Sequence, residues 1–316
     1  MSWLTDLTRP KIKEVSTDTF KDVPDNLWSK CPKCEGMLYH RDLENNFYVC
    51  NHCGYCLRLS SKLRFAHLFD DGAYEEIELP ASAKTDPLGF KDVKRYSERL
   101  REYRKKTGSK NDAFTLALGK IGAHPAVVGV LDFDFGGGSM GQAVGEGIVA
   151  AATLAVMENA ALILIPSSGG ARMQEGMISL MQMPRTVYAV NHVKDNGLPY
   201  IVIMANPVMG GVSASFAMLG DIILSEPLAE IGFAGRIVIE RFIRETLPEN
   251  FLAAENLMEN GMVDMVVKRE DLPDTLRTIL AHLFAPVVKG LSRAEKKDAL
   301  SPFVKESRKS KNPAKS

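Results

Sequence analysis

Uninterrupted apolar runs alternate with glycine-rich segments in the central part of the chain. The runs are AVVGVLDFDF at 126–135, ALILIP at 161–166 and YIVIMA at 200–205, and they lead into GGGSMG, SSGGAR and NPVMGG. Short apolar runs bounded by turn residues are typical of strands that are buried on both faces. The pattern therefore predicts three buried strands, each of which ends in a glycine-rich loop.

Helical segments follow these loops. Residues 143–157 are rich in alanine, a long segment rich in Met and Leu runs to about Asp195, and VSASFAML at 212–219 follows the third loop. Short strands are expected near Ile222 and Ile231. Three repeats of strand, loop and helix predict an α/β fold in which helices cover a sheet of buried strands.

All five cysteines lie near the N-terminus, between Cys31 and Cys56. CPKC and CNHC form two C-x2-C pairs separated by fifteen residues, the spacing of a ribbon in which Cys31, Cys34, Cys50 and Cys53 bind one zinc ion. The alternatives are a disulfide pair or an iron–sulfur cluster that uses Cys56. Four thiolates fill a tetrahedral shell, so we expect the zinc to be structural and the chemistry to take place elsewhere.

Composition divides the chain into four expected parts. They are a flexible N-terminal lead at 1–25, the zinc ribbon at 26–60, the α/β domain at 61–290 and a basic, disordered tail at 291–316. Within the third part, KDVKRYSERLREYRKK at 91–106 predicts a helix with eight basic and three acidic residues. This run is either a solvated helix face or a surface that attracts a polyanion such as nucleic acid.

The whole-chain charge narrows the possible partners only slightly. Lys+Arg and Asp+Glu are balanced at 39 each, and 45% of the residues are hydrophobic, as in a globular protein with no obligatory nucleic-acid or membrane partner. The longest run near the chain centre without a charged or strongly polar residue, 147–157 apart from Thr153, is too short to span a bilayer, and the first residues lack the apolar region of a signal peptide. We therefore expect a cytoplasmic protein.

The sequence does not satisfy either of two common nucleotide-binding motifs. Gly136-x-Gly138-x-x-Gly141 follows a predicted strand and opens a helix, as a dinucleotide fingerprint does. The acidic residue that should end the next strand is missing, because that strand ends in IPSSGG. The sequence also contains no G-x-x-x-x-G-K-[ST], so it argues against a nicotinamide, a flavin or ATP bound through a P-loop.

The second and third glycine loops offer backbone N–H groups instead of catalytic side chains. Gly169, Gly170 and Ala171 follow one strand, and Gly210 and Gly211 follow the next. A loop that enters a helix presents unpaired N–H groups at the positive end of the helix dipole, and two adjacent loops can form an oxyanion hole. The alternative is that each glycine pair only closes a helix or permits tight packing.

The side chains in these loops do not predict a nucleophile. Neither Ser167 nor Ser168 lies in a G-x-S-x-G sequence, and no His is nearby, so Ser168 is expected to cap a helix. Arg172 occupies the first turn of a predicted helix, where a cation opposes the dipole. We expect it to have a partner, which is either an anionic ligand or Glu175.

Longer motifs resemble one known family. They are, in order, GGSMG, SGGARMQEG, SLMQMPRT, GLPYI, MGGVSASFAMLGD, EIGFAG and NGMVDMVVKR. With the cysteine pairs, they resemble the carboxyltransferase beta subunits of bacterial acetyl-coenzyme A carboxylase from about Trp28 to Leu283. The resemblance implies a crotonase-like (ClpP/crotonase) superhelix of repeated β-β-α units with an N-terminal four-cysteine zinc ribbon.

The resemblance also implies a reaction and partners. A beta subunit assembles with an alpha subunit into an α2β2 carboxyltransferase, which works with biotin carboxylase and the biotin carboxyl carrier protein. It transfers the carboxyl group of carboxybiotin to acetyl-CoA and gives malonyl-CoA for fatty-acid synthesis, while ATP is used by biotin carboxylase. Biotin itself accepts the methyl proton, so no protein base is needed. A nucleic-acid-binding zinc ribbon and another crotonase-like acyl-CoA enzyme are the alternatives.

The catalytic groups that the resemblance implies are backbone amides that bind the thioester enolate. They are those of Gly170, Ala171, Gly210 and Gly211. The implied substrate-binding residues are Gly137, Gly138, Gly169 and Arg172. We expect Arg172 and the basic helix to contact the phosphates of CoA. The chain departs from the family pattern at Gly147, Ala151, Arg236 and Ile237. The family's CoA or alpha-subunit contacts at these four positions therefore do not carry over directly.

Overall fold

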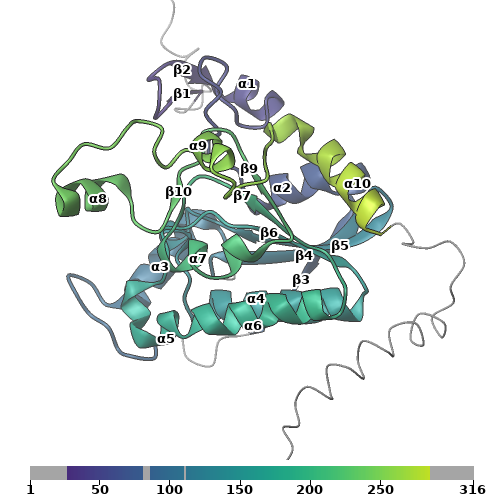
Figure 1. Cartoon of the computed structure of the whole chain (residues 1–316). Coiled ribbons are helices and arrows are strands. Elements are labelled where there is room, and N and C mark those ends of the chain that lie inside the picture. Colours follow the sequence, from purple (N-terminus) through teal and green to yellow (C-terminus); the bar gives the residue numbers. More distant parts are fainter. Residues whose placement is uncertain (1–26, 81–85, 110–111, 285–316) are drawn as a thin grey trace, which may run out of the picture.

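A computed structural model describes residues 27–80, 86–109 and 112–284 (Figure 1). The expected lead at 1–25 and the expected tail at 291–316 lie outside these residues. A seven-stranded mixed sheet forms the centre of the fold, in the order β11-β9-β7-β6-β5-β4-β3. Its strands are β3 (Tyr74–Ile77), β4 (Phe114–Ile121), β5 (His124–Leu131), β6 (Ala161–Ile165), β7 (Tyr200–Met204), β9 (Ile222–Ser225) and β11 (Met265–Val266).

The three predicted apolar strands lie next to one another in this sheet. β5 pairs with β6, and β6 with β7, and both pairs are parallel. Every residue of β6 and β7 is buried, which explains their uninterrupted apolar sequences. Because parallel strands point the same way, the loops that follow β6 and β7 emerge at the same edge of the sheet. The sequence prediction of the three strands is confirmed, except that β5 ends at Leu131 and residues 133–135 form a turn where the strand was expected to continue.

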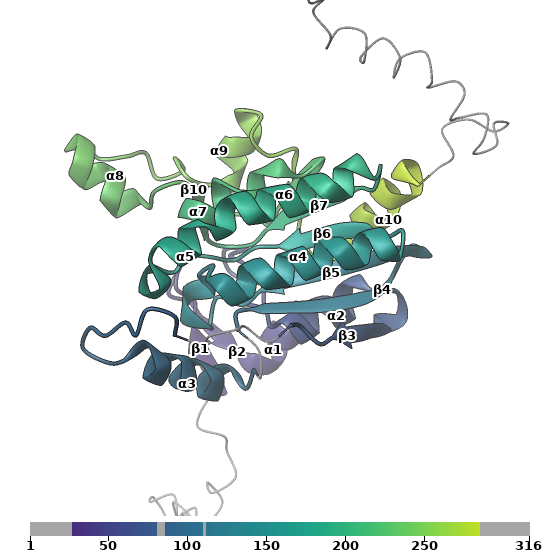
Figure 2. The same cartoon turned by 90° about the horizontal axis from the view of Figure 1, so that it is seen from below.

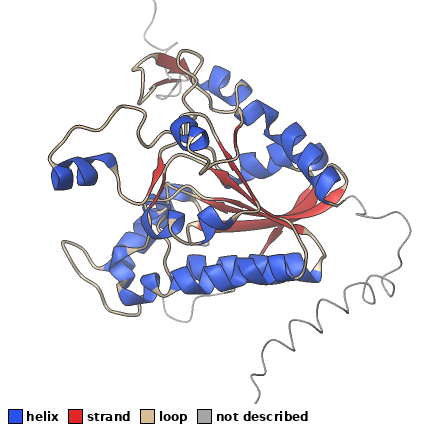
Figure 3. Ribbon diagram, in the orientation of Figure 1, coloured by secondary structure: helices blue, strands red, loops and turns tan. Residues whose placement is uncertain are grey.

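Helices cover both faces of the sheet (Figure 3). α4 (Gln142–Met157) and α6 (Gln182–Asp195) lie side by side on one face, as Figures 1 and 2 show. α2 (Ser61–Leu68) and α10 (Leu272–Leu283) pack on the other face, against a second group of buried side chains from the same strands. The α/β class and its buried sheet are as predicted.

The predicted long helix that ends near Asp195 is interrupted. A 3-10 turn (Met173–Glu175) and the short helix α5 (Met177–Leu180) precede α6. Gly176 lies between them with φ 51° and ψ −128°, a conformation that no helix contains and that favours glycine. The prediction missed this break because the apolar residues continue through it.

Two other predicted helices are also shorter than expected. Residues 212–219 do not form one helix, because Ser215 has φ −125° and ψ −115° between α7 (Gly210–Ser213) and a 3-10 turn. The basic helix α3 spans Tyr96–Thr107 and does not begin at Lys91. Before it, the carboxylate of Asp92 accepts the backbone N–H of Lys94 at 3.0 Å, which holds a turn.

Short elements complete the description. The predicted strands near Ile222 and Ile231 are β9 and β10 (Ile231–Gly232), and β10 pairs with β8 (Val208–Met209) in parallel. The N-terminal ribbon contains β1 (Trp28–Lys30), β2 (Met37–Tyr39) and α1 (His40–Asn45), and it packs at one end of the sheet. α8 (Arg236–Ile243) and α9 (Ala254–Glu259) follow β10.

Candidate active site

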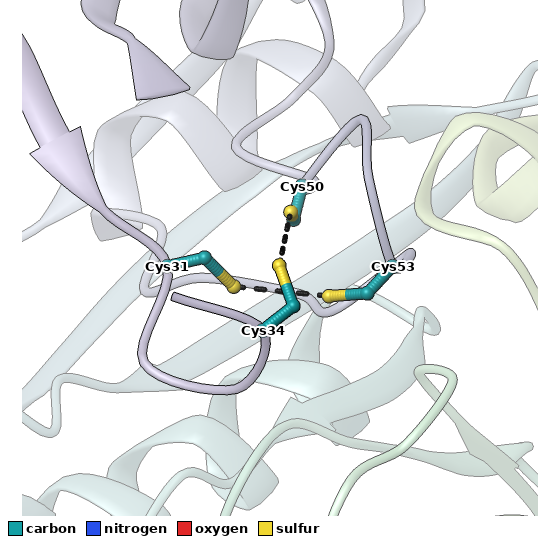
Figure 4. Close-up of side chains that lie close together, drawn as sticks. All are labelled: Cys31, Cys34, Cys50 and Cys53. Carbon is teal, nitrogen blue, oxygen red and sulfur yellow. Dashed lines mark hydrogen bonds between the residues drawn. The ribbon is translucent and has the colours of Figure 1, made fainter. Parts of the chain in front are cut away.

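The four ribbon cysteines converge on one point (Figure 4). Their sulfur atoms lie within 4.8 Å of one another, with Sγ–Sγ distances of 3.7 Å for Cys31–Cys53 and for Cys34–Cys50. All four thiols are free, so the disulfide alternative is wrong for this arrangement. Each knuckle contributes one cysteine to each of these close pairs. Four thiolates at these positions fit the tetrahedral shell of a structural zinc ion and leave no open position for substrate.

A buried ion network fixes the ribbon to the α/β domain. Glu226 follows β9 and is fully buried, and its carboxylate accepts hydrogen bonds from Arg64 of α2 at 2.7 Å and from Arg269 at 2.7 and 2.8 Å. Arg269 also donates to the backbone carbonyls of Phe47 (2.6 Å) and Leu57 (3.0 Å) in the ribbon. Burial alone raises the pKa of Glu226, but the two guanidinium groups outweigh it and hold that pKa at about 2.

The two glycine loops are in direct contact. Ser168 forms a bridge with Val208, and the N–H of Met209 donates to the carbonyl of Ser168 at 2.9 Å. A Cβ atom placed on Gly170 would lie 3.2 Å from the carbonyl oxygen of Met209 and 3.3 Å from the nitrogen of Gly211. Gly170 also has a φ of 114°, which side chains rarely allow. A glycine is therefore required where the two backbones approach each other.

Most of the amides in these loops already have acceptors. The N–H of Gly169 donates to the carbonyl of Gly137 (2.9 Å), and that of Gly210 to the carbonyl of Phe233 (2.9 Å). The N–H of Gly170 donates to the hydroxyl of Ser168 (3.0 Å). Ser168 thus closes a turn within its own loop, and the expectation that it caps a helix is wrong.

Two amides remain. Within the residues that the structure describes, the backbone N–H groups of Ala171 and Gly211 have no hydrogen-bond acceptor. Both residues are partly exposed, and a Cβ placed on Gly211 would lie 3.5 Å from the nitrogen of Ala171. Two unpaired donors on facing loops are the elements from which an oxyanion hole is built. Of the four amides implied as catalytic, only these two are available to a ligand.

The glycine loop at 136–141 packs against the loop that follows β6. Gly138 is buried, and a Cβ there would lie 1.9 Å from the carbonyl oxygen of Ser167, so this glycine permits close packing between the loops. Gly138 was expected to contact the substrate, but the structure buries it between the two loops. Gly137 has open space where its Cβ would be, and Gly169 is exposed, so contacts of these two residues with substrate remain predictions.

Arg172 is not a substrate clamp. Its side chain is 2% exposed, and its guanidinium forms a bidentate ion pair with Asp112 (2.8 and 2.5 Å). The remaining donors reach Glu175 (3.4 Å), Tyr96 (3.0 Å) and both oxygens of Ser139 (2.7 and 3.0 Å). Burial acts to lower the pKa of Arg172, but the neighbouring Asp112 reverses this and the pKa is raised. No N–H of this side chain is left for a CoA phosphate.

Glu175, the local partner considered for Arg172, has a second role. Its carboxylate accepts the hydroxyl of Tyr96 at 2.6 Å and the backbone N–H of Gln142 at 2.6 Å, at the start of α4. A carboxylate at a helix N-terminus satisfies an unpaired N–H and interacts favourably with the dipole. Arg172 and Glu175 thus join α3, α4 and the loop after β6 into one rigid support beneath Ala171.

Sequence comparison identifies the chain's relatives. Residues 90–312 match the carboxyl transferase domain, and residues 28–53 match the acetyl-CoA carboxylase zinc finger domain. The acetyl-coenzyme A carboxylase carboxyl transferase subunit beta of Gluconacetobacter diazotrophicus is 51% identical over 291 residues, which cover 90% of this chain and 95% of that protein. The subunit of the same name from Granulibacter bethesdensis is 54% identical, over 90% of this chain and 91% of that protein.

Solved structures share the fold. A transcarboxylase 12S structure with methylmalonyl-coenzyme A aligns with a TM-score of 0.57 and 24% identity, over 71% of this chain and 41% of that chain. The MdcD–MdcE hetero-dimer of Pseudomonas malonate decarboxylase aligns with a TM-score of 0.54 and 23% identity, over 78% of this chain and 95% of that chain. At these identities the likeness concerns the fold alone.

The sheet, the two facing glycine loops and the four-cysteine ribbon define a carboxyl transferase of the crotonase-like fold with an appended zinc ribbon. More specifically, the chain belongs to the family of acetyl-coenzyme A carboxylase carboxyl transferase beta subunits. It is a transferase subunit, and this membership favours the carboxyltransferase interpretation over a nucleic-acid-binding ribbon. No helix among the described residues is long and apolar enough to cross a membrane.

Proposed function

We propose that this subunit binds the acetyl thioester of acetyl-CoA and stabilises its enolate with the N–H groups of Ala171 and Gly211. The enolate then takes the carboxyl group from carboxybiotin and becomes malonyl-CoA. The observation that carries the proposal is that these two amides, on facing loops, lack any acceptor among the described residues. Donors fixed before the reaction stabilise the oxygen where negative charge develops, and each contributes about 3 to 4 kcal/mol in comparable sites.

The two loops that carry these amides contain no residue that could act as a base. Residues 167–171 and 206–211 contain no His, Asp, Glu, Lys or Cys. Asp112 and Glu175, which support the loop that carries Ala171, are already paired with Arg172. Carboxybiotin on a carrier protein would supply the carboxyl group as CO2, and the biotin nitrogen freed in that step would take the methyl proton. The residues of this chain therefore bind and orient the thioester and hold the charge of its oxygen.

The surface proposed to bind the alpha subunit includes helix α8. This helix contains no buried residue, and it exposes Ile237, Val238 and Phe242 at 65%, 62% and 89%. In Figure 1 it stands away from the sheet. Phe233, which precedes α8 in sequence, is also 73% exposed, and its carbonyl accepts the N–H of Gly210 beside the site. We name these four residues the α8 face, and we assign it to the alpha subunit, because apolar patches of this kind mark protein interfaces.

The remaining parts of the proposal concern the complete enzyme. This chain and the alpha subunit are proposed to assemble into an α2β2 carboxyltransferase. Biotin carboxylase is proposed to use ATP to carboxylate the biotin on its carrier protein. A cytoplasmic location is included, because a reducing compartment keeps the four zinc-binding thiols free. The ribbon at 26–60 and the carboxyltransferase domain at 61–290 are assigned as the two folded parts.

Reconstitution tests this function. The purified chain alone should form no malonyl-CoA from acetyl-CoA and carboxybiotin, whereas addition of its alpha subunit should produce it, as measured by mass spectrometry. The isolated alpha subunit is the matched control. Absence of malonyl-CoA from an assembled complex with bound zinc would contradict the proposal. Turnover by the chain alone would favour a free-standing crotonase-like enzyme instead.

A further inference from the structure

Tyr55 connects the zinc ribbon to one of the glycine loops. Its backbone carbonyl accepts the N–H of Cys50 at 2.9 Å, so the residue is part of the second cysteine knuckle. Its side chain leaves the ribbon, and its hydroxyl accepts a hydrogen bond from the side-chain nitrogen of Asn206 at 2.7 Å. Asn206 lies two residues after β7, at the start of the loop that leads to Gly211.

Asn206 joins three separate segments. While its Nδ2 atom donates to Tyr55, its Oδ1 atom accepts the backbone N–H of Glu230 at 2.9 Å. Its backbone carbonyl accepts the hydroxyl of Ser167, in the first of the two facing loops, at 2.9 Å. One side chain and one carbonyl therefore link the ribbon, the loop after β6 and the segment that enters β10.

The contacts continue from Glu230 to the oxyanion site. The carbonyl of Glu230 accepts the N–H of Val208 at 2.8 Å, and β10 then pairs in parallel with β8. At the end of this pair, the carbonyl of Phe233 accepts the N–H of Gly210 at 2.9 Å. The peptide that carries the N–H of Gly211 follows directly. Its direction depends on where the segment 230–233 is held, and Asn206 holds one end of that segment.

We propose that Asn206 is a positioning residue for the oxyanion site and that Tyr55 extends this positioning to the zinc ribbon. The ribbon then contributes to turnover by fixing the direction of the Gly211 amide, without touching the substrate. This inference rests on the proposed function of the Ala171 and Gly211 amides. A small misplacement of a catalytic donor costs much rate, because hydrogen-bond strength falls steeply with distance and angle.

The ribbon has a second attachment to the α/β domain that does not involve Tyr55. Arg269, paired with Glu226, holds the carbonyls of Phe47 and Leu57 on the other side of the knuckle. Removal of the Tyr55 hydroxyl therefore leaves the ribbon attached and its four cysteines in place. The two contributions, attachment and positioning, can be measured separately.

The test uses Tyr55→Phe in the complex with the alpha subunit. We expect kcat for malonyl-CoA formation to fall about tenfold, while KM for acetyl-CoA changes less than about twofold. Bound zinc should stay at one ion per chain. Tyr39→Phe is the matched control, because Tyr39 lies in the same ribbon and its hydroxyl has no hydrogen bond within the described residues. This control should keep the wild-type kcat.

A double-variant cycle separates positioning from general damage. Asn206→Ala should lower kcat at least as far as Tyr55→Phe does, and Tyr55→Phe should have no further effect when Asn206 is already Ala. An unchanged kcat in Tyr55→Phe, loss of zinc, a parallel rise in KM, or additive effects in the cycle would each overturn the inference. Failure of the proposed function is distinguishable, because a bulky residue at Gly211 would then leave turnover intact.

Discussion

The guanidinium of Arg172 and the carboxylate of Asp112 form a bidentate ion pair beneath the loop that carries Ala171, with Nη1–Oδ2 and Nη2–Oδ1 distances of 2.8 and 2.5 Å. Sixty residues separate the two in sequence. Because both groups are almost inaccessible, the pair cannot bind an anionic ligand without first breaking. Its contribution is to stability and to the rigidity of the loop.

Arg172→Leu should therefore lower the free energy of unfolding by about 3 to 5 kcal/mol, since Asp112 and Glu175 would remain buried without their cation. Urea denaturation measures this loss. Arg277→Met is the matched control, because Arg277 is 43% exposed and its ion pairs should contribute less than about 1 kcal/mol. An Arg172 variant with normal stability and a raised KM for acetyl-CoA would show instead that this arginine contacts the substrate.

Gly211→Val should reduce kcat about a hundredfold or more, because its Cβ would lie 3.3 Å from the Cβ of Ala171 and would cover the approach to both amides. Steady-state kinetics of the assembled enzyme measure the effect, with zinc content and assembly as controls. Ala214→Val places the same side chain at an exposed position three residues away and should leave turnover intact. If Gly211→Val retains turnover, the loop after β7 does not supply an oxyanion donor.

Glu226 should make stability depend on pH in the acidic range. Its pKa is about 2 in the folded chain, compared with 4.5 when it is unperturbed, so the unfolded state binds the proton first as pH falls. The group stabilises the fold above about pH 4.5, and this contribution, on the order of 3 kcal/mol, is lost between about pH 4.5 and 2. Urea denaturation of wild type and of Glu226→Gln from pH 6 to 3 measures the difference.

Both proteins share any loss of zinc at low pH, so the difference between them isolates Glu226. Glu226→Gln should also be less stable at neutral pH, because Arg64 and Arg269 then lack their shared carboxylate. Equal pH dependence of the two proteins below pH 5 would contradict the assigned role of this ion network.

Zinc binding should require the four clustered cysteines and should not require the fifth, Cys56. Cys53→Ser should lose the metal, and the ribbon should unfold with it, since the free energy of zinc binding stabilises such small units by roughly 10 to 16 kcal/mol. Cys56→Ser is the control, because burial raises the pKa of Cys56 to about 11 and the residue lies outside the cluster. Elemental analysis of purified protein distinguishes the two. Loss of zinc from Cys56→Ser would show that the ligand set is wrong.

Phe242→Asp should weaken binding of the alpha subunit while leaving zinc content and melting temperature unchanged, because this side chain is 89% exposed among the described residues and little packing would be lost. Val93→Asp is matched to it, since Val93 is a 90% exposed apolar residue outside the α8 face. Analytical ultracentrifugation of the mixed subunits compares the two. Normal assembly of Phe242→Asp would remove the α8 face from the interface.

Local sequence was sufficient for the strands and for the cysteine site. β6 and β7 are continuous apolar runs, and the C-x2-C spacing alone restricts the ribbon to a few geometries. The two glycine loops could also be placed together, because parallel neighbouring strands end at one edge. These features depend on residues that are close in sequence or on a periodic pattern.

The selection of two amides among the loop residues could not be predicted in this way. The N–H of Gly210 is occupied by the carbonyl of Phe233, more than twenty residues further along the chain, and that of Gly169 by Gly137. Arg172 likewise finds Asp112 far from it in sequence. Which donor stays free is decided by tertiary neighbours, and the local pattern carries no signal of them.

Arg269 limits how far the zinc ribbon can be separated from the rest of the chain. Its guanidinium donates hydrogen bonds to Glu226 in the core and to the backbone carbonyls of Phe47 and Leu57 in the ribbon. Removal of the N-terminal segment would thus leave these Arg269 donors without their carbonyl acceptors, and transfer of the ribbon to another protein would leave the carbonyls without their donor. The metal-binding segment is not an interchangeable module, and any truncated or chimeric version would need a replacement for this arginine as well.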